Sequence, residues 1–473
     1  LTTMYNSMLS GPITHARNLT GNLFTTVLRP TSMAVGYLMD GDVDAAKASM
    51  AAMGAISEAW GEAFAVAGKT WNTGIPSGGS AKFEKYTAET LKEIETLKKS
   101  AITPSQQQAA GYIENLYNFT NNPYMDAPSR ALGASDDFFK TLNARVELKR
   151  QAYMETLEAT GVVKFDPDVY ARIADAKMRN GEITDEGLLQ ITKEATFQQE
   201  LQGNMKTIQG LIDGNPLAKY FIPFVRTGHN IAVYAGTFTP GLNRFLKEAQ
   251  AIRMGDDEAA KAMLKGRVAI GYGTLAMGSM LAANGLLTGN GPADPELRKI
   301  WERNNQPQSI KLGDKWVSYQ SIEPLNQMFS VSADLFAAAA YLPERDTMRF
   351  QAQLYYTFAK AFTEKSYFSG LHSAIAYLNP GTAGNINIPR ELYGAINSFI
   401  PFAGARNQLG KAMSPGIYEF NTELESALAR ALPGYKLFAQ EDIDIFTGET
   451  KQNTTSAGPV FHVINQFLSL IHI

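Results

Sequence analysis

The 473-residue sequence contains no cysteine. This absence excludes disulfides, thiolate catalysis and every cysteine-based metal site. It leaves the redox compartment open, although a protein without thiols is compatible with passage between oxidising and reducing surroundings. The five histidines are widely scattered, and none lies in an HExxH or comparable ligand spacing. A zinc hydrolase is therefore not expected.

Other catalytic signatures are missing as well. The sequence has neither a GxSxG nucleophile elbow nor a GxxxxGK[ST] phosphate loop. The aspartates of Asp40–Asp44 imitate a calcium loop, but Ala45 and Ala51 stand where glycine and a bidentate glutamate are needed, so we interpret them as a turn before a helix. Gly271–Gly273 is a GxG without the third glycine, which indicates packing. We expect no enzyme activity, cofactor or metal.

Strong charge of either sign is also missing, because 43 Lys and Arg oppose 46 Asp and Glu, for a net charge of −3. A chain with this balance lacks the basic excess of a protein that coats DNA, so any DNA contact should be local, weak and without sequence preference. Hydrophobic residues make up 45% and charged residues 19%, which excludes wholesale disorder. The length predicts roughly two to four domains.

Apolar residues recur at spacings of three and four through most of the chain, which predicts helices. The clearest helix should begin at Ser135, with Asp136 and Asp137 in its first turn, and end at Gly161. Strand signals are scarce. One hairpin is expected at about 308–320, where Gly313 can open a two-residue turn.

The fold class expected is therefore mainly α, an elongated multi-helix assembly with one small β-hairpin that sets Ile310 opposite Val317. Three regions are expected along the chain: an N-terminal helical region over 1–134, a central helical region over 135–290, and a C-terminal helical region over 291–473 that carries the hairpin.

One segment stands out because it lacks charge from Val268 to Ala293 and is dense in small residues. About 20 uncharged residues suffice to span a bilayer as a helix. Small residues four apart let helices approach closely, and the candidate packing positions are Gly271, Thr274, Gly278 and Ala282. Lys265 and Arg267 precede the segment, a bias that would place its N-terminal end on the cytoplasmic side. The alternative is a helix over 268–288 buried in a soluble domain.

Five stretches of the chain, each different, combine polar, aromatic and small residues in distinctive orders. The first has the form SGPxTHxxNxxGN and comprises Ser10, Gly11, Pro12, Thr14, His15, Asn18, Gly21 and Asn22. The second has the form PxRALxxxDxFFK and comprises Pro128, Arg130, Ala131, Leu132, Asp136, Phe138, Phe139 and Lys140. The third runs over Pro223–Asn230, includes Arg226, and ends at Thr239-Pro240. The fourth is the small-residue segment followed by Gln306–Ile310 and the hairpin. The fifth is Ser398–Ala405, with Leu432–Gly434 later.

In this order, the five stretches resemble the internal virion, or ejection, proteins of short-tailed bacteriophages and related large polyvalent phage proteins. The resemblance implies a protein packed inside the capsid near the portal, ejected with the genome, that helps form a path for DNA through the host envelope. Implied partners are further copies of the chain, other portal or core proteins, double-stranded DNA bound non-specifically, and the host inner membrane.

Other interpretations stay open at this point. Some relatives carry a lytic transglycosylase domain elsewhere in a longer polypeptide, and the opening Leu1 suggests a segment of something longer. The chain could thus be a fragment of a cell-wall-degrading enzyme. It could also be a soluble capsid core scaffold that never meets a membrane. For the motif residues, Pro12 could simply begin a helix, and Arg226, His229 and Asn230 could satisfy backbone groups at a broken helix.

Overall fold

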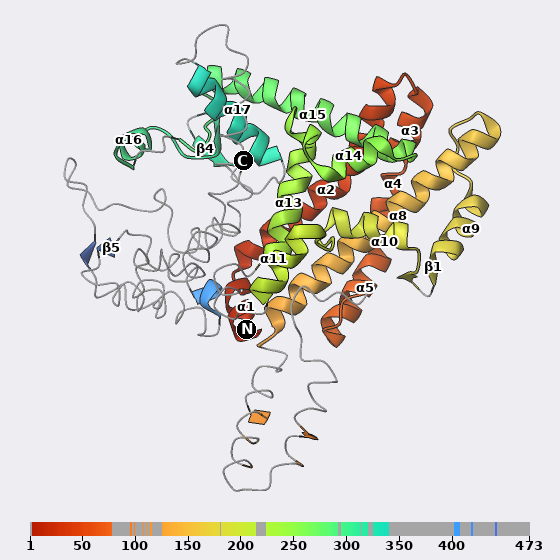
Figure 1. Ribbon diagram of the computed structural model, residues 1–473, viewed down its shortest axis with the longest axis horizontal. Helices are drawn as coiled ribbons and strands as arrows, with labels where there is room; N and C mark the ends of the chain where they lie inside the picture. The colour runs from red at the N-terminus through yellow and green to blue at the C-terminus, as the bar shows by residue number, and fades with distance from the viewer. Residues whose placement is uncertain are drawn as a thin grey trace. The chain divides into compact units, whose positions relative to one another are not determined.

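The computed structural model describes residues 2–77, 125–179, 181–213, 224–291, 295–313, 315–319, 325–339 and 402–406, with two short strands at 418–419 and 440–441 and isolated residues between 95 and 115. Helices dominate these residues (Figure 1). In chain order the helices are α1 (Thr2–Leu9), α2 (Pro12–Met39), α3 (Val43–Ala51), α4 (Gly54–Glu58), α5 (Trp60–Thr73), α8 (Ala127–Thr160), α9 (Pro167–Lys177), α10 (Glu186–Ala195), α11 (Gly203–Asp213), α13 (Val225–Phe238), the 3-10 helix η1 (Leu242–Arg244), α14 (Lys247–Met254), α15 (Glu258–Ala283), α16 (Pro295–Trp301) and α17 (Leu325–Ala339). The mainly α prediction is confirmed.

The expected hairpin is present as β3 (Ser309–Leu312) and β4 (Lys315–Ser318), which pair antiparallel with Ile310 opposite Val317 as predicted. Gly313 opens the turn with a φ of +62°, a conformation that glycine adopts without a steric cost. Two further strand pairs, β1 (Met178–Arg179) with β2 (Glu182–Ile183) and β5 (Tyr418–Glu419) with β6 (Gln440–Glu441), are too short to carry a sequence signal.

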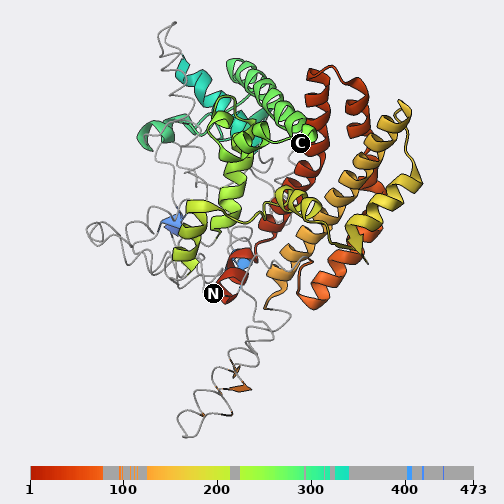
Figure 2. The same ribbon diagram turned by 45° about the vertical axis from the view of Figure 1, so that its right-hand side comes forward.

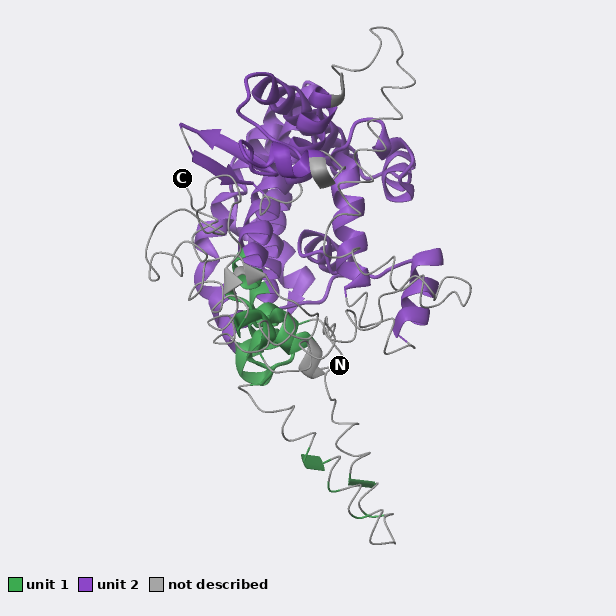
Figure 3. Cartoon of the chain, turned by 90° about the vertical axis from the view of Figure 1, so that its left-hand side faces the viewer, with its two compact units in different colours: residues 1–16, 69–135, 379–468 green, residues 17–68, 136–378, 469–473 purple. Residues whose placement is uncertain are grey.

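The chain divides into two compact units (Figure 3). Unit 1 comprises residues 1–16, 69–135 and 379–468, and unit 2 comprises residues 17–68, 136–378 and 469–473. The three regions expected along the sequence are a different division and stay a prediction.

Within unit 1, the start of α8 corrects the sequence prediction. The helix begins at Ala127, eight residues before Ser135, so Ser135 lies inside it and does not cap it. The Asn6 side chain on α1 accepts a hydrogen bond from the Ser129 N–H at 3.1 Å, which satisfies one of the free N–H groups of the first turn. The local sequence also carried a start signal there, because Asp126 directly precedes the helix and Pro128 is its second residue.

The C-terminal end of α8 is where the sequence placed it. The helix ends at Thr160, and Gly161 follows with a φ of +70° while its N–H bonds the Leu157 carbonyl at 2.7 Å. Figure 2 shows α9 running alongside α8. Between them lies a buried apolar cluster that includes Ala144 and Leu148 of α8 and Ile173 of α9.

Several helices of unit 2 begin at an aspartate whose carboxylate accepts a backbone N–H. Asp42 caps α3, Asp166 caps α9, Asp185 caps α10 and Asp257 caps α15. Such caps contribute about 1 kcal/mol each. The Asp42 cap confirms the interpretation of the acidic turn as a helix start, because its carboxylate bonds the Ala45 N–H at 2.9 Å.

The main apolar core of unit 2 joins α2, α13 and α17. Its buried members include Leu28, Ile231, Phe238, Met328 and Val331, and Ile270 and Leu275 of α15 pack against them. α17 lies against α15 (Figure 1). This arrangement places α15 between three other helices and explains why so many of its residues are small.

The segment expected as a helix over 268–288 belongs to a helix with other bounds. α15 begins ten residues earlier, at Glu258, and ends five residues earlier, at Ala283. The chain turns after Asn284, and Leu287 forms a β-bridge with Ile310 of the hairpin and is buried beside Tyr319. The last five residues of the expected helix, 284–288, therefore lie outside α15, and Leu287 among them packs in the hairpin cluster. Among the described helices, none combines the length and the apolar character required to cross a bilayer.

Candidate functional site

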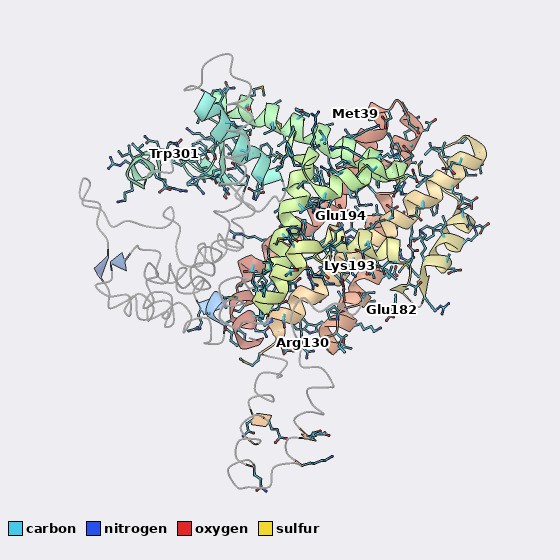
Figure 4. All side chains as sticks on the ribbon, viewed as in Figure 1. Met39, Arg130, Glu182, Lys193, Glu194 and Trp301 are labelled. Atoms are coloured by element: carbon cyan, nitrogen blue, oxygen red, sulfur yellow. The ribbon has the colours of Figure 1, made fainter. Side chains whose placement is uncertain are left out.

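A charged cluster in unit 2 joins Glu194 of α10, labelled in Figure 4, to an arginine on each of two other helices. Its carboxylate accepts hydrogen bonds from Arg29 Nη1 of α2 at 2.9 Å and is paired with Arg267 Nη2 of α15 at 2.8 Å. Two guanidinium groups therefore share one carboxylate, which ties α2, α10 and α15 together.

The Arg267 side chain is only 2% exposed and is held by more than its ion pair. Its guanidinium lies 4.6 Å from the ring centroid of Tyr234 and 5.7 Å from that of Phe238, both on α13. Such cation–π contacts stabilise a desolvated guanidinium. Burial works against the charge of Glu194, but Arg267 and Arg29 outweigh it and hold the pKa of this carboxyl below its usual value. Glu194 is therefore ionised at neutral pH.

A second charged pair stands next to the first. Arg150 and Glu147, one turn apart on α8, form two hydrogen bonds of 2.6 and 3.1 Å. Burial would raise the pKa of Glu147, but the adjacent Arg150 charge and its hydrogen bonds lower this pKa to about 2. Gln151 adds a third hydrogen bond at 2.9 Å. This pair is a fully ionised, hydrogen-bonded unit within one helix.

These charged groups line a pocket of about 320 Å³. Its walls come from α2, α8, α10, α13, α14 and α15, so it is assembled from residues far apart in the sequence. Besides the charged residues it is lined by Asn230 and Thr237, which are polar, and by Val233, Ile252 and Met263, which are apolar. The volume falls at the lower end of small-molecule sites. We take this charged pocket as the candidate functional site.

The described residues contain no group of three or more histidine, aspartate or glutamate side chains arranged to hold a metal ion. The pocket offers guanidinium and amide groups together with four carboxylates, of which those of Glu248 and Asp257 are on exposed residues. Its chemistry is that of binding a charged group.

The predicted packing positions of the small-residue segment lie on the face of α15 that contacts other helices. A side chain at Gly271 would stand 1.7 Å from the Phe238 carbonyl oxygen of α13, and one at Gly278 would stand 1.9 Å from Ser332 Oγ of α17. Thr274 is buried between them, and Ala282 packs against the hairpin cluster. The small residues thus serve close helix packing inside unit 2.

A second close approach was missed by sequence reasoning. A side chain at Gly266 of α15 would stand 1.7 Å from the Ser32 carbonyl oxygen of α2, and one at Gly36 of α2 would stand 1.8 Å from the Ala262 carbonyl oxygen. Both helices therefore carry small residues four apart at their crossing. The four-residue spacing of small residues is present in each sequence. It was overlooked because charged residues surround Gly266, which lies before the uncharged segment.

Two residues of the first motif, Ser10 and Gly11, contact residues of the fifth motif within unit 1. The Ser10 hydroxyl donates to the Ser7 carbonyl at 2.7 Å and accepts from the Ala405 N–H at 3.1 Å. Gly11 is buried, and a side chain at Gly404 would stand 2.8 Å from its nitrogen. The first and fifth motifs therefore meet in the structure, although nearly 400 residues separate them in sequence.

The remaining residues of the first motif lie on α2. Pro12 is its first residue, as expected for a helix start. His15 is half-buried, and burial lowers the pKa of its imidazole. Asn18 is also half-buried, in the part of α2 that belongs to unit 2.

The second motif also joins elements. In unit 1, Arg130 donates to the Trp71 and Asn72 carbonyls at 3.0 and 2.9 Å and pairs with Asp126. It thereby satisfies carbonyls in the last turn of α5.

The later residues of this motif are buried in unit 2. Asp136 accepts a hydrogen bond from the Gln198 amide at 2.7 Å. The Lys140 ammonium is 3.3 Å from the Asp137 carboxylate, and both side chains are almost fully buried.

Part of the third motif confirms the alternative interpretation made from sequence. The Asn230 amide, on α13, donates to the Phe197 and Gln199 carbonyls at 3.1 and 2.8 Å, so it satisfies backbone groups after α10. Arg226 stands in the first turn of α13, with a buried Nε that has no hydrogen-bond partner. Pro223 lies outside the described residues, as do Leu432–Gly434 of the fifth motif.

The residues at the centre of the charged pocket were missed. Sequence reasoning used Arg267 only as a flanking charge and did not single out Arg29 or Glu194. A signal existed for Arg29, because it lies deep in a long helix whose neighbouring residues are uncharged. Nothing in the local sequence pairs Glu194 with either arginine, because the three residues are brought together only by the fold.

Comparison of the chain with protein-family models, with curated proteins and with solved structures finds no match in any of the three. The resemblance to phage ejection proteins therefore continues to depend on the sequence motifs alone.

Proposed function

We propose that this chain is a structural protein of a bacteriophage particle, held inside the capsid near the portal and ejected into the host, where it helps form a conduit for the genome. It acts by assembly and not as an enzyme. The observation that carries the proposal is the role of the motif residues, which connect elements of the fold.

Four examples support this interpretation. Ser10 bonds the backbone of the fifth motif, Arg130 bonds the end of α5, Asp136 bonds Gln198, and Asn230 bonds the segment after α10. Each motif residue reaches a segment distant in the sequence and stabilises its position. Catalytic residues would instead converge on one site with an acid, base or nucleophile in reach of a substrate.

The proposed partners are further copies of the chain, portal or core proteins, double-stranded DNA and the host inner membrane. Unit 2 exposes several large apolar side chains, and assembly with further copies or with other virion proteins would cover them. They include Phe64, Leu211, Phe245 and Met254, of which Met254 is 79% exposed. The near-neutral charge favours a passing contact with DNA, since little counterion release is available.

The decisive experiment is mass spectrometry of intact particles and of particles emptied of their genome. The proposal expects the chain in intact particles and its loss from emptied ones. Recovery from both kinds of particle would favour a core scaffold that stays behind, and absence from both would overturn virion residence.

Two assays on the purified chain separate the rival functions. A muralytic assay should show no cleavage of cell wall, and cleavage would assign the chain to the enzyme class. Sedimentation should show self-association at high concentration, because a conduit around the tail axis requires repeated copies. A stable monomer, with and without lipid vesicles, would count against the assembly.

A further inference from the structure

The walls of the charged pocket in unit 2 carry more buried positive groups than buried negative groups. Three guanidinium groups line it, those of Arg29, Arg150 and Arg267, and each residue is at most 8% exposed. Two carboxylates face them, that of the buried Glu147 and that of Glu194, whose side chain is 20% exposed. Glu248 and Asp257 also line the pocket but are exposed, so water screens their charges. One buried positive charge is left over.

The leftover charge belongs to the pair that shares Glu194. Arg150 is paired with Glu147 through two hydrogen bonds, and the Arg29 charge acts on Glu147 without a hydrogen bond. Arg29 and Arg267 divide a single carboxylate, and the Nε of each is buried with no hydrogen-bond partner. An uncompensated buried charge is costly, and proteins remove the cost with a counterion. The pocket beside these two guanidinium groups is the space in which a counterion fits.

The remaining walls define the rest of the ligand. Asn230 and Thr237 line the pocket with polar side chains that already donate to backbone carbonyls, whereas Val233, Ile252 and Met263 supply an apolar surface. A pocket of about 320 Å³ holds more than a bare inorganic ion. We infer that this pocket binds a small organic oxyanion, a carboxylate or a phosphate ester with a short apolar body, at Arg29 and Arg267. This inference is independent of the proposed virion function.

The test is calorimetric titration of the full chain, at constant ionic strength, with hexanoate, with inorganic phosphate and with hexanol. We expect saturable binding of one hexanoate or one phosphate per chain and a rise in the melting temperature, and no binding of hexanol. The hexanoate and phosphate arms distinguish the two sources of the oxyanion. Binding of hexanol as strong as that of hexanoate, or no saturable binding of either anion, would overturn the inference.

Two matched variants each replace one exposed glutamate by glutamine, the first at the pocket and the second away from it. Glu248→Gln removes a carboxylate from the rim of the pocket and should tighten anion binding about two- to threefold, since exposed charge pairs are weak. Glu258→Gln removes one from the first turn of α15, outside the pocket, and should leave the affinity unchanged. Equal effects of the two variants would show non-specific attraction.

A third variant addresses the pocket directly. Arg29→Gln should weaken anion binding at least tenfold, because it leaves Arg267 paired with Glu194 and no guanidinium in excess. Circular dichroism checks that this variant is folded. If it unfolds, the Glu248→Gln and Glu258→Gln pair still decides the question, because both substitutions are at exposed positions. Unchanged affinity in folded Arg29→Gln would contradict the inference.

Discussion

α8 and α15 are both long helices packed against others, but they differ in what they bury besides apolar side chains. The buried face of α8 carries polar and charged side chains, among them Asp137, Lys140, Asn143, Glu147 and Arg150. The buried face of α15 carries Gly266, Gly271, Thr274 and Gly278, with Arg267 as its single buried charge.

The difference shows two ways to bury a helix. α8 supplies the counterions of two of its buried cations, because Lys140 pairs with Asp137 and Arg150 pairs with Glu147 three residues away on the same helix. α15 instead lets neighbouring backbones come close, and the counterion of Arg267 comes from α10. We therefore expect α15 to be sensitive to side-chain size and α8 to be sensitive to charge and pH.

The largest expected effect comes from adding a side chain where α15 crosses α2. Gly266→Leu places its Cβ 1.7 Å from the Ser32 carbonyl oxygen, and a backbone atom cannot move aside without shifting a helix. We expect loss of the cooperative unfolding transition in urea. Gly273→Leu on the same helix is the matched control, because nothing lies within 4 Å of a side chain there. It should be neutral or stabilise the protein by up to about 1 kcal/mol. Equal stability of the two variants would contradict the close contact between α15 and α2 at Gly266.

On α8, the expected sensitivity is to charge. Glu147→Leu alone or Arg150→Met alone should each lower the free energy of unfolding by about 3–5 kcal/mol, because each leaves the other group buried and unpaired. The double variant should cost far less than the sum, with a coupling energy of about 2–3 kcal/mol. Urea unfolding of the four proteins measures it.

The control for this cycle is an exposed pair with the same spacing. Lys47 and Asp44 of α3 lie 2.8 Å apart, with their side chains more than half exposed. Their coupling should stay below about 0.5 kcal/mol. A coupling of Glu147 and Arg150 as small as this value would contradict their burial.

A smaller effect is expected from pH. Because folding lowers the pKa of Glu147 from 4.5 to about 2, this carboxylate stabilises the fold above pH 4.5, and the stabilisation is lost as the pH falls toward 2. Glu194 acts in the same direction. Between pH 6 and pH 3 the natural chain should lose about 2 kcal/mol more than Glu147→Gln does. Parallel losses in urea unfolding at the two pH values would show that Glu147 is not paired.

Local signals predicted local features of this fold well. Gly161 marks the end of α8, the Gly313 turn sets the hairpin register, and Asp42 marks the start of α3. These features depend on a few neighbouring residues. Features that depend on distant residues were missed, such as the close crossing of α2 and α15 at Gly36 and Gly266.

The candidate site belongs to the second kind. Glu194 reads as an ordinary residue of an amphipathic helix, and its role depends on two arginines that are 165 and 73 residues away in the sequence. Likewise, α15 ends before Thr288, and Leu287, which follows it, packs in the cluster beside the hairpin. Sequence periodicity does not record which distant surface will cover a residue.

The smallest effect on folding is expected at Met277, next to one of the critical glycines. Met277 is 46% exposed, so Met277→Arg places a charge in water and should change the free energy of unfolding by less than about 0.5 kcal/mol. Gly278→Leu, one residue on, must displace Ser332 of α17 and should be strongly destabilising, with partial rescue by Ser332→Gly.

The same Met277→Arg variant also tests the proposed contact with the host membrane. If this face of α15 enters the bilayer during infection, the arginine costs about 2.5–3.5 kcal/mol there, and particles that assemble normally should fail to deliver DNA. Normal assembly together with normal delivery would restrict α15 to packing inside the folded protein.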